Sequence, residues 1–226
     1  MNTAARKFEN DIRSHRIARA ECCKLLSACF YPPQVKMLLE EEITEKLGAL
    51  LKTVFPDAVA PVVSAGKHLE SENQVALSVA YTRLFLGPPA VLAPPYASFY
   101  LDGPGGVMGP ASVEIMKMYA EMGLRIDDTF NEMPDHVTVV LEFLYYLLFL
   151  AANEKSTTDT DKKAQIGHAA NCFLNRFVKT WIPQFCVQVI QANQHPFYNG
   201  IAQCLDMFIR YGVNGVNGVK GDNYVC

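Results

Sequence analysis

The sequence lacks the signatures of several common classes of protein. Its seven cysteines include no C-x-x-C pair, so neither a zinc site nor a thioredoxin-like centre has support. It contains no G-x-x-x-x-G-K-[ST] and no G-x-S-x-G, which leaves a P-loop and a hydrolase nucleophile without support. It also lacks an excess of basic residues, and a formal charge of −3 argues against nucleic acid as the main partner.

A signal peptide and an apolar run of membrane-spanning length are missing as well. Residues 1–21 are polar and charged, with no apolar core before a cleavage site. The most apolar segment, residues 137–152, has about 16 apolar-rich positions including Glu142, fewer than the roughly 20 that a bilayer requires. We therefore expect a cytoplasmic protein that is not a membrane protein, with this segment as a central buried helix.

Apolar residues recur at helical spacing through most of the chain, and no segment shows sustained strand alternation. With 226 residues, half of them hydrophobic, the chain can bury a sizeable core, and most cysteines fall on apolar helix faces. The acidic run Glu40–Glu42 is typical of a solvated helix face rather than a cation site. The pattern predicts an all-α fold with helices over 12–31, 35–54, 56–69, about 77–86, 110–122, 134–152, 164–181, from 183, and around 197–208.

One loop interrupts this helical pattern. Residues 87–110 contain six prolines and five glycines, and a loop of this length within a compact domain is usually functional or disordered. It carries Leu92, Tyr96, Phe99 and Tyr100, apolar residues that a disordered linker would lack. We therefore predict an ordered, partly apolar loop that is pinned against the fold.

Candidate polar residues are few, and none indicates a metal site or a catalytic residue. The histidines show no i, i+4 pair that would place two ligands on one helix face. The glycine-rich stretch 102–106 precedes no lysine and follows no strand, so Gly105 and Gly106 give only weak support for a nucleotide hydrolase. Asp135 and His136, at the head of the most apolar helix, either cap that helix or line a binding pocket walled by the loop.

Several segments together resemble one family. RAECCKLLSACFYPP, YTRLFLGP, APPYASFYLD, MYAEMGL, PDHVTVVLEFLYYL, FLNRFVKTWIPQF and HPFYNGIA occur in family order over about residues 15–210. The chain is thereby identified as resembling the TorD/DmsD/NarJ family of redox-enzyme maturation chaperones. It is most similar to the branch serving dimethyl-sulfoxide-reductase-type enzymes, although that branch often has tryptophan where this chain has Tyr96.

The resemblance implies a single helical domain whose halves, about 1–86 and 110–212, are joined by the loop 87–109 and followed by a flexible tail, 213–226. It implies a cytoplasmic chaperone, not an enzyme, that binds the twin-arginine signal peptide of a molybdopterin oxidoreductase precursor. Such a chaperone delays export until the molybdopterin cofactor is inserted into the apo-enzyme, and holds no cofactor or metal itself. The Tat translocon is a further candidate partner, and the state is a monomer or a homodimer. The alternative from the NarJ branch is assembly of a non-exported reductase subunit.

The resemblance also implies a signal-peptide site. An apolar groove at Leu84, Phe85 and Tyr96 would take the apolar part of the peptide. Asp135, Asp102 or Glu40–Glu42 would face its arginines. Tyr96, Asp135 and His136 are the preferred candidates, because a loop and a helix start are more often exposed. The family's binding region maps here onto Tyr81, Arg83, Leu84, Phe85, Pro95, Tyr96, Ser98, Tyr100, Asp135 and His136.

Overall fold

The computed structural model describes residues 3–71, 73–87, 90–103, 108–127, 132–153 and 160–213, and within them the secondary structure is helical, with one isolated β-bridge. The predicted all-α fold is confirmed. The α-helices are α1 (Thr3–Ala28), α2 (Val35–Glu40), α3 (Ile43–Val54), α4 (Val59–Glu70), α5 (Gln74–Tyr81), α6 (Ala97–Leu101), α7 (Pro110–Glu121), α8 (Val137–Ala152), α9 (Thr160–Phe173), α10 (Ile182–Ala192) and α11 (Pro196–Met207). A 3₁₀ turn, Pro56–Ala58, precedes α4. π-Helical turns extend α5 (Thr82–Leu86), α9 (Leu174–Val178) and α11 (Phe208–Gly212).

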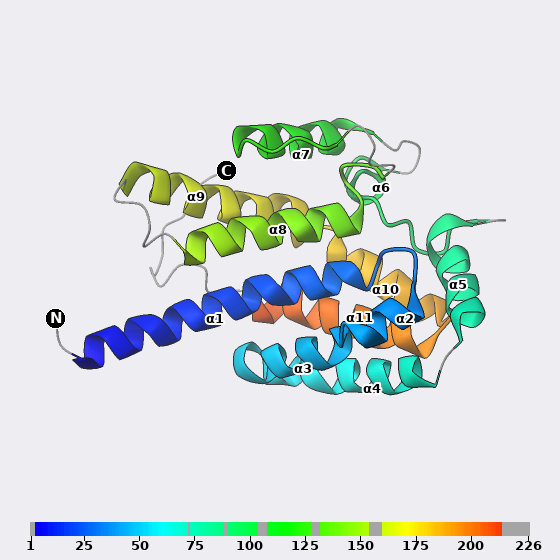
Figure 1. The fold of residues 1–226 in the computed structure, drawn as a ribbon. Coiled ribbons are helices and arrows are strands. Elements are labelled where there is room, and N and C mark those ends of the chain that lie inside the picture. The colour runs from blue at the N-terminus through cyan, green and yellow to red at the C-terminus, as the bar shows by residue number, and fades with distance from the viewer. Residues whose placement is uncertain are drawn as a thin grey trace.

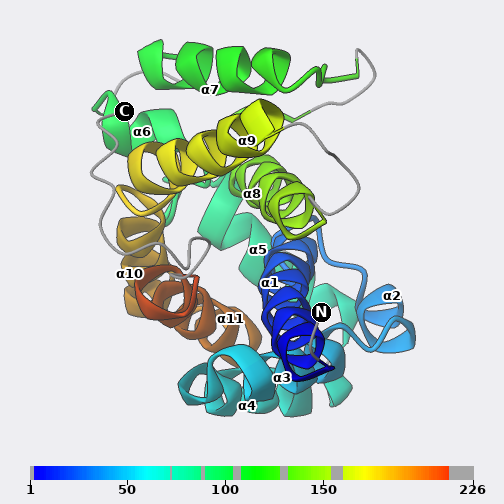
Figure 2. The ribbon, with the colours of Figure 1, turned by 90° about the vertical axis from the view of Figure 1, so that its left-hand side faces the viewer.

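The long helix α1 organises the packing. It contacts α8 on one side and α3 on the other, and α11 packs against α4 and α10 (Figure 1). Helix α7 lies outermost, beyond α8 and α9, in both views (Figures 1 and 2). Helices from before and after the long loop thus share one hydrophobic core, which includes Phe30, Trp181 and Tyr198.

The predicted single helix over 35–54 is wrong. Two helices, α2 and α3, occupy this range, and the chain turns between them at Glu41 and Glu42. Glu42 has a left-handed backbone with φ of 51°, which an α-helix cannot contain. The turn allows both Leu38 and Ile43 to be buried. The acidic residues of the turn are exposed, and Glu41 lies 4.0 Å from Lys46, as expected of a solvated face.

The loop between α5 and α7 is ordered and packed over residues 90–103, as predicted. The Ala93 N–H donates to the Leu84 carbonyl at 2.8 Å, and Ala93 and Ala97 are completely buried. Within the range predicted as loop, the chain forms the short helix α6. The loop is therefore a built part of the fold next to the head of α8.

Helix α7 begins and ends where the sequence indicates. The Asp102 carboxylate accepts a hydrogen bond from the Ala111 N–H at 3.0 Å, one of the first donors of the helix. At the other end, Gly123 has φ of 76°, and the Leu124 N–H donates to the Tyr119 carbonyl at 2.9 Å. These are features of a Schellman ending, for which the left-handed glycine is required.

Helix α8 is the most apolar helix, and its inner faces are buried among α1, α9 and the loop. The prediction of a central buried helix is confirmed, although Glu142 and Phe149 reach the surface. In the described part of the chain, no helix has both the length and the apolar character needed to cross a bilayer.

The proposed division into halves, and the proposed tail, stay predictions. The contacts of α1 with α8 and of α4 with α11 join the two predicted halves extensively. Of the predicted tail 213–226, only Val213 belongs to the described residues, and it is buried against the core.

Candidate functional site

The loop is attached to the head of α8 by a short piece of antiparallel pairing. Tyr96 and His136 form a β-bridge. The Ala97 N–H donates to the Asp135 carbonyl at 3.0 Å, and the Val137 N–H donates to the Pro95 carbonyl at 2.7 Å. These bonds fix residues on the two segments relative to each other across a long separation in sequence.

Asp135 completes this junction with its side chain. Its Oδ2 accepts a hydrogen bond from the Ser98 N–H at 2.8 Å and so caps the start of α6. Asp135 has 0% of its surface exposed, and its Oδ1 and the Ser98 hydroxyl are buried without a hydrogen-bond partner among the described residues. The expectation that a helix start leaves Asp135 and His136 exposed is wrong, since His136 is only 2% exposed. Their assignment to the peptide site stays a prediction.

His136 caps the following helix. Its Nδ1 accepts from the Thr138 N–H at 3.3 Å and lies 2.8 Å from the Thr138 hydroxyl. Burial lowers the pKa of His136 to about 4, although the nearby Glu132 and Asp135 act in the opposite direction. The ring is therefore neutral at pH 7, as a capping acceptor must be, and it packs edge-on against the ring of Tyr96 at 5.4 Å.

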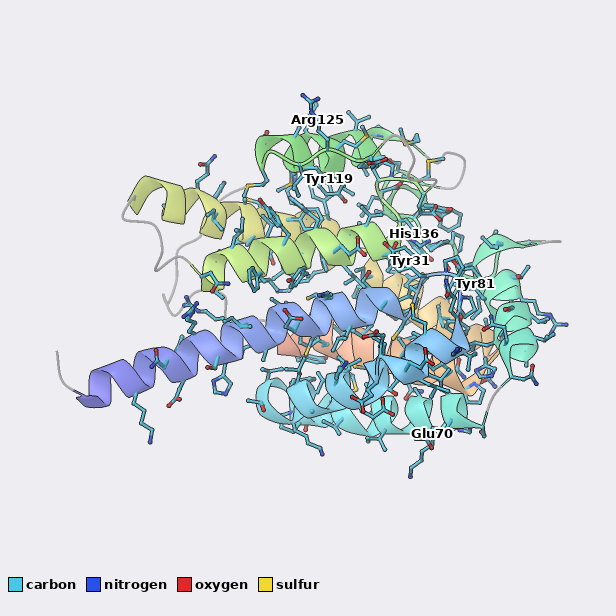
Figure 3. The ribbon with its side chains drawn as sticks, in the orientation of Figure 1. Tyr31, Glu70, Tyr81, Tyr119, Arg125 and His136 are labelled. Atoms are coloured by element: carbon cyan, nitrogen blue, oxygen red, sulfur yellow. The ribbon has the colours of Figure 1, made fainter. Side chains whose placement is uncertain are left out.

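Around this junction lies a group that we name the tyrosine–carboxylate cluster: Tyr31, Tyr81, Tyr96, Glu132 and Glu142. The Tyr96 hydroxyl donates to Glu132 at 3.0 Å, and the Tyr31 hydroxyl donates to Glu142 at 2.8 Å. In the view of Figure 3, Tyr31, Tyr81 and the neighbouring His136 lie in the right-hand half, where α1 ends and α8 begins. Five segments of the chain therefore meet in one polar, aromatic cluster, in which Tyr81 is the most buried member, with 4% of its surface exposed.

The tyrosines of the cluster are held as neutral donors. Burial, assisted by the charge of Glu132, raises the pKa of Tyr81 to about 12. Burial also raises the pKa of Tyr31 to about 12, with further contributions from Glu142 and Glu132. Both carboxylates thus contribute to the raised pKa of Tyr31, Glu142 more than Glu132.

The chemistry of the cluster suits a cation with several N–H donors. Glu142 is exposed and Glu132 is half-buried, so their oxygens are accessible to a bound group. A carboxylate forms strong, charge-assisted hydrogen bonds with a guanidinium group, and an aromatic face attracts the same cation.

An apolar groove of about 270 Å³ adjoins the cluster. Its floor is a stripe of α8 at i, i+3, i+4 and i+7, and its wall is the segment that follows α7. Glu142 belongs to both the groove and the cluster. The residues that line the groove are Tyr119, Leu124, Arg125, Ile126, Asp127, Val139, Glu142, Phe143 and Tyr146.

Other predicted site residues lie in the core or elsewhere on the surface. Leu84 and Phe85 are 0% and 3% exposed, and the ring of Phe85 packs edge-on against Phe30 and Tyr198. Arg83 is exposed on the π-helical turn that extends α5.

Tyr100 points into the molecule rather than into the cluster. Its ring stacks on Trp181 with centroids 5.5 Å apart, and its hydroxyl donates to Gln188 at 2.7 Å. The structure therefore brings together Tyr81, Pro95, Tyr96, Ser98, Asp135 and His136, but not all ten predicted residues.

Sequence reasoning missed Tyr31, Glu132 and Glu142. Glu142 had a visible signal, since it is the only charged residue in the most apolar segment, 137–152. Tyr31 directly precedes the Pro32-Pro33 stop of the first helix, and Glu132 lies three residues before Asp135. Only the fold shows that these positions meet.

Features of other functions are weak in the described part of the chain. Within it, no group of three or more histidine, cysteine, aspartate or glutamate side chains is arranged to hold a metal ion. Gly105 and Gly106, the candidates for a phosphate-binding loop, lie outside the described residues.

Comparison with known proteins identifies the family. A family model described as the nitrate reductase delta subunit matches residues 39–187, which is more than half of the chain. The chain belongs to this family. A chaperone protein TorD of Vibrio parahaemolyticus is 29% identical over 68% of this chain and 71% of its own length. A TorD chaperone of Aliivibrio salmonicida is 26% identical over 92% of this chain and 99% of its own.

A solved structure supports the same placement. A protein from Archaeoglobus fulgidus, described as a redox enzyme maturation protein, has a TM-score of 0.54 and 25% sequence identity, and the match covers 85% of this chain and 93% of that one. The predicted membership in the TorD/DmsD/NarJ family is confirmed, and the function class that the chain shares with these relatives is that of a maturation chaperone.

Proposed function

We propose that this chaperone binds the twin-arginine signal peptide of a molybdopterin oxidoreductase precursor in the cytoplasm. It holds the precursor back from the Tat translocon until the molybdopterin cofactor has been inserted. The observation that carries the proposal is the tyrosine–carboxylate cluster, because a site for two arginines requires accessible carboxylates beside aromatic rings.

Glu132 and Glu142 are the two acceptors for the arginines. Each already accepts a hydrogen bond from a tyrosine, Tyr96 for Glu132 and Tyr31 for Glu142, and this orients the carboxylates before the peptide arrives. Oε1 of Glu132 also accepts from the Met133 N–H at 3.1 Å, and Oε1 of Glu142 accepts from the Ser27 hydroxyl at 3.4 Å. A carboxylate has about four lone-pair sites, so these bonds still leave room for a guanidinium group. Because these side chains are already ordered, less conformational entropy is lost when the peptide binds.

Asp135 and His136 act by positioning. Asp135 holds the start of α6, and His136 caps α8 and packs on Tyr96. Together with the backbone bonds of Pro95 and Ala97, they keep Tyr96 and Glu132 in place. Tyr81 lies behind the site, with its ring packed on Phe85, and supports it from the core.

Calorimetric titration with a synthetic twin-arginine signal peptide tests the proposal, beside a peptide with both arginines changed to alanine. We expect binding that depends on the arginines and is weakened by Glu132→Gln and by Glu142→Gln. Glu70→Gln is the matched control, since Glu70 is an exposed carboxylate at the end of α4, at the lower edge of the view in Figure 3 and apart from the cluster. Equal binding of both peptides would contradict the proposal.

The match to the nitrate reductase delta subunit family favours one alternative, the assembly of a non-exported reductase subunit. In that case the same site would receive an N-terminus without a twin-arginine signal. Binding of such a segment, with no binding of the twin-arginine peptide, would favour this alternative.

A further inference from the structure

We propose that the apolar groove beside Glu142 receives the apolar stretch of the same signal peptide, one or two of its side chains at a time. The inference rests on the proposed function for the identity of the peptide. It moves the apolar subsite away from Leu84 and Phe85, whose side chains are already packed in the core.

The position of Glu142 connects the two parts of the site. Its carboxylate accepts the Tyr31 hydrogen bond in the cluster and also lines the groove. On α8, Val139 lies nearly one turn before Glu142, and Phe143 and Tyr146 follow it, so the floor is apolar on both sides of Glu142. A ligand that places a cation at Glu142 therefore meets apolar surface within about one helical turn, roughly 5 Å.

The opposite wall gives the groove a direction. The Tyr146 hydroxyl lies 3.5 Å from the Met122 carbonyl, which places the start of the wall, at Leu124, beside the far end of the floor. Leu124, Ile126 and Asp127 form this wall. The end of the groove farthest from the head of α8, at Phe143, Tyr146 and Leu124, is thus apolar, and Glu142 lies between that end and the cluster. This order complements a peptide with a basic end followed by an apolar stretch.

The volume of the groove limits what it takes. A cavity of about 150 Å³ holds one benzene molecule, so about 270 Å³ accommodates one or two large apolar side chains. This matches helix-in-groove recognition, in which anchors one turn apart enter a groove and the rest of the helix stays outside. Arg125 also lines the groove, but its side chain extends away from the body of the molecule (Figure 3).

The test uses three peptides: the full twin-arginine peptide, one with its apolar stretch replaced by serine and glutamine, and one with both arginines changed to alanine. The protein variants are Ile126→Asp, in the groove wall, and Val113→Asp, an exposed apolar position on the neighbouring α7. We expect Ile126→Asp to weaken the full peptide about 10- to 100-fold, which corresponds to losing one buried apolar side chain. It should leave the serine–glutamine peptide unaffected, and Val113→Asp should change neither.

The other outcomes separate failure of the groove assignment from failure of the arginine site. Equal effects of Ile126→Asp and Val113→Asp on the full peptide would overturn the groove assignment while leaving the arginine site standing. If the unaltered protein binds the alanine peptide with full affinity and Ile126→Asp loses this binding, the groove assignment is supported and the arginine site is contradicted. A full peptide that fails to bind the unaltered protein would overturn both.

A crosslinking experiment avoids any change to the protein. A benzophenone side chain in the apolar stretch of the peptide should crosslink to residues 124–127 or to α8. Crosslinks confined to α5 or α10 would overturn the groove assignment even if Ile126→Asp failed to fold.

Discussion

Replacing Asp135 separates its role as a cap from a direct role in binding. In Asp135→Ala, the Ser98 N–H loses its acceptor at 2.8 Å and stays buried. An unsatisfied buried donor costs about 1–3 kcal/mol, so the free energy of unfolding should fall by about 2 kcal/mol. For a chain of this size, that lowers Tm by roughly 4–8 °C. Urea unfolding followed by circular dichroism measures the change, with the helical signal of the native state unchanged.

Asp135→Asn provides the matched control. Asparagine keeps an oxygen that can accept from Ser98 and is as good a cap as aspartate, so we expect the loss of stability to stay below about 1 kcal/mol. If Asp135 acts by positioning Tyr96, Asp135→Asn also retains most of the peptide affinity that Asp135→Ala loses. Asp135→Ala with unchanged stability would refute the capping role, and Asp135→Asn that is stable yet unable to bind would refute the positioning role.

Three further outcomes follow from the packing and from the buried histidine. Between pH 6.5 and about 4, the unfolded chain binds a proton at His136 that the folded protein excludes. The free energy of unfolding should therefore fall by up to about 3 kcal/mol as the pH drops through this window. The same dependence of stability on pH in His136→Asn would count against the assignment to His136. Gly200→Ala would bring a Cβ to 2.6 Å from the Pro61 carbonyl oxygen, and chemical denaturation should show a loss of about 1–3 kcal/mol. Tyr100→Ala removes the ring stacked on Trp181, the only tryptophan, and the fluorescence of Trp181 should change without unfolding; an identical spectrum would contradict the stacked arrangement.

The helices could be predicted from the sequence because their apolar period is continuous and their ends carry proline and glycine. The start of α7 at Pro110 and its Gly123 ending are examples, each with a local cause. The break between α2 and α3 had no such mark. It depends on a left-handed glutamate, which apolar periodicity does not reveal.

The site could be predicted only in part. The resemblance pointed to Tyr96, Asp135 and His136, and the structure brings them together through the β-bridge. Their burial was not foreseeable from position alone, since the loop covers the head of α8. The carboxylates escaped notice because Glu142 and Tyr31 belong to segments more than a hundred residues apart, joined only by the packing of α1 on α8.

A thermodynamic cycle between the peptide and the cluster tests the central proposal most directly. Calorimetry would measure six affinities: those of the unaltered protein, Glu142→Gln and Glu132→Gln, each with the twin-arginine peptide and with its double-alanine version. We predict a coupling energy of at least about 1.5 kcal/mol, as measured for close charge pairs across interfaces. The contradicting result is that the protein substitution and the peptide substitution change the binding free energy additively, within about 0.5 kcal/mol, for both Glu142→Gln and Glu132→Gln. The arginines would then bind elsewhere.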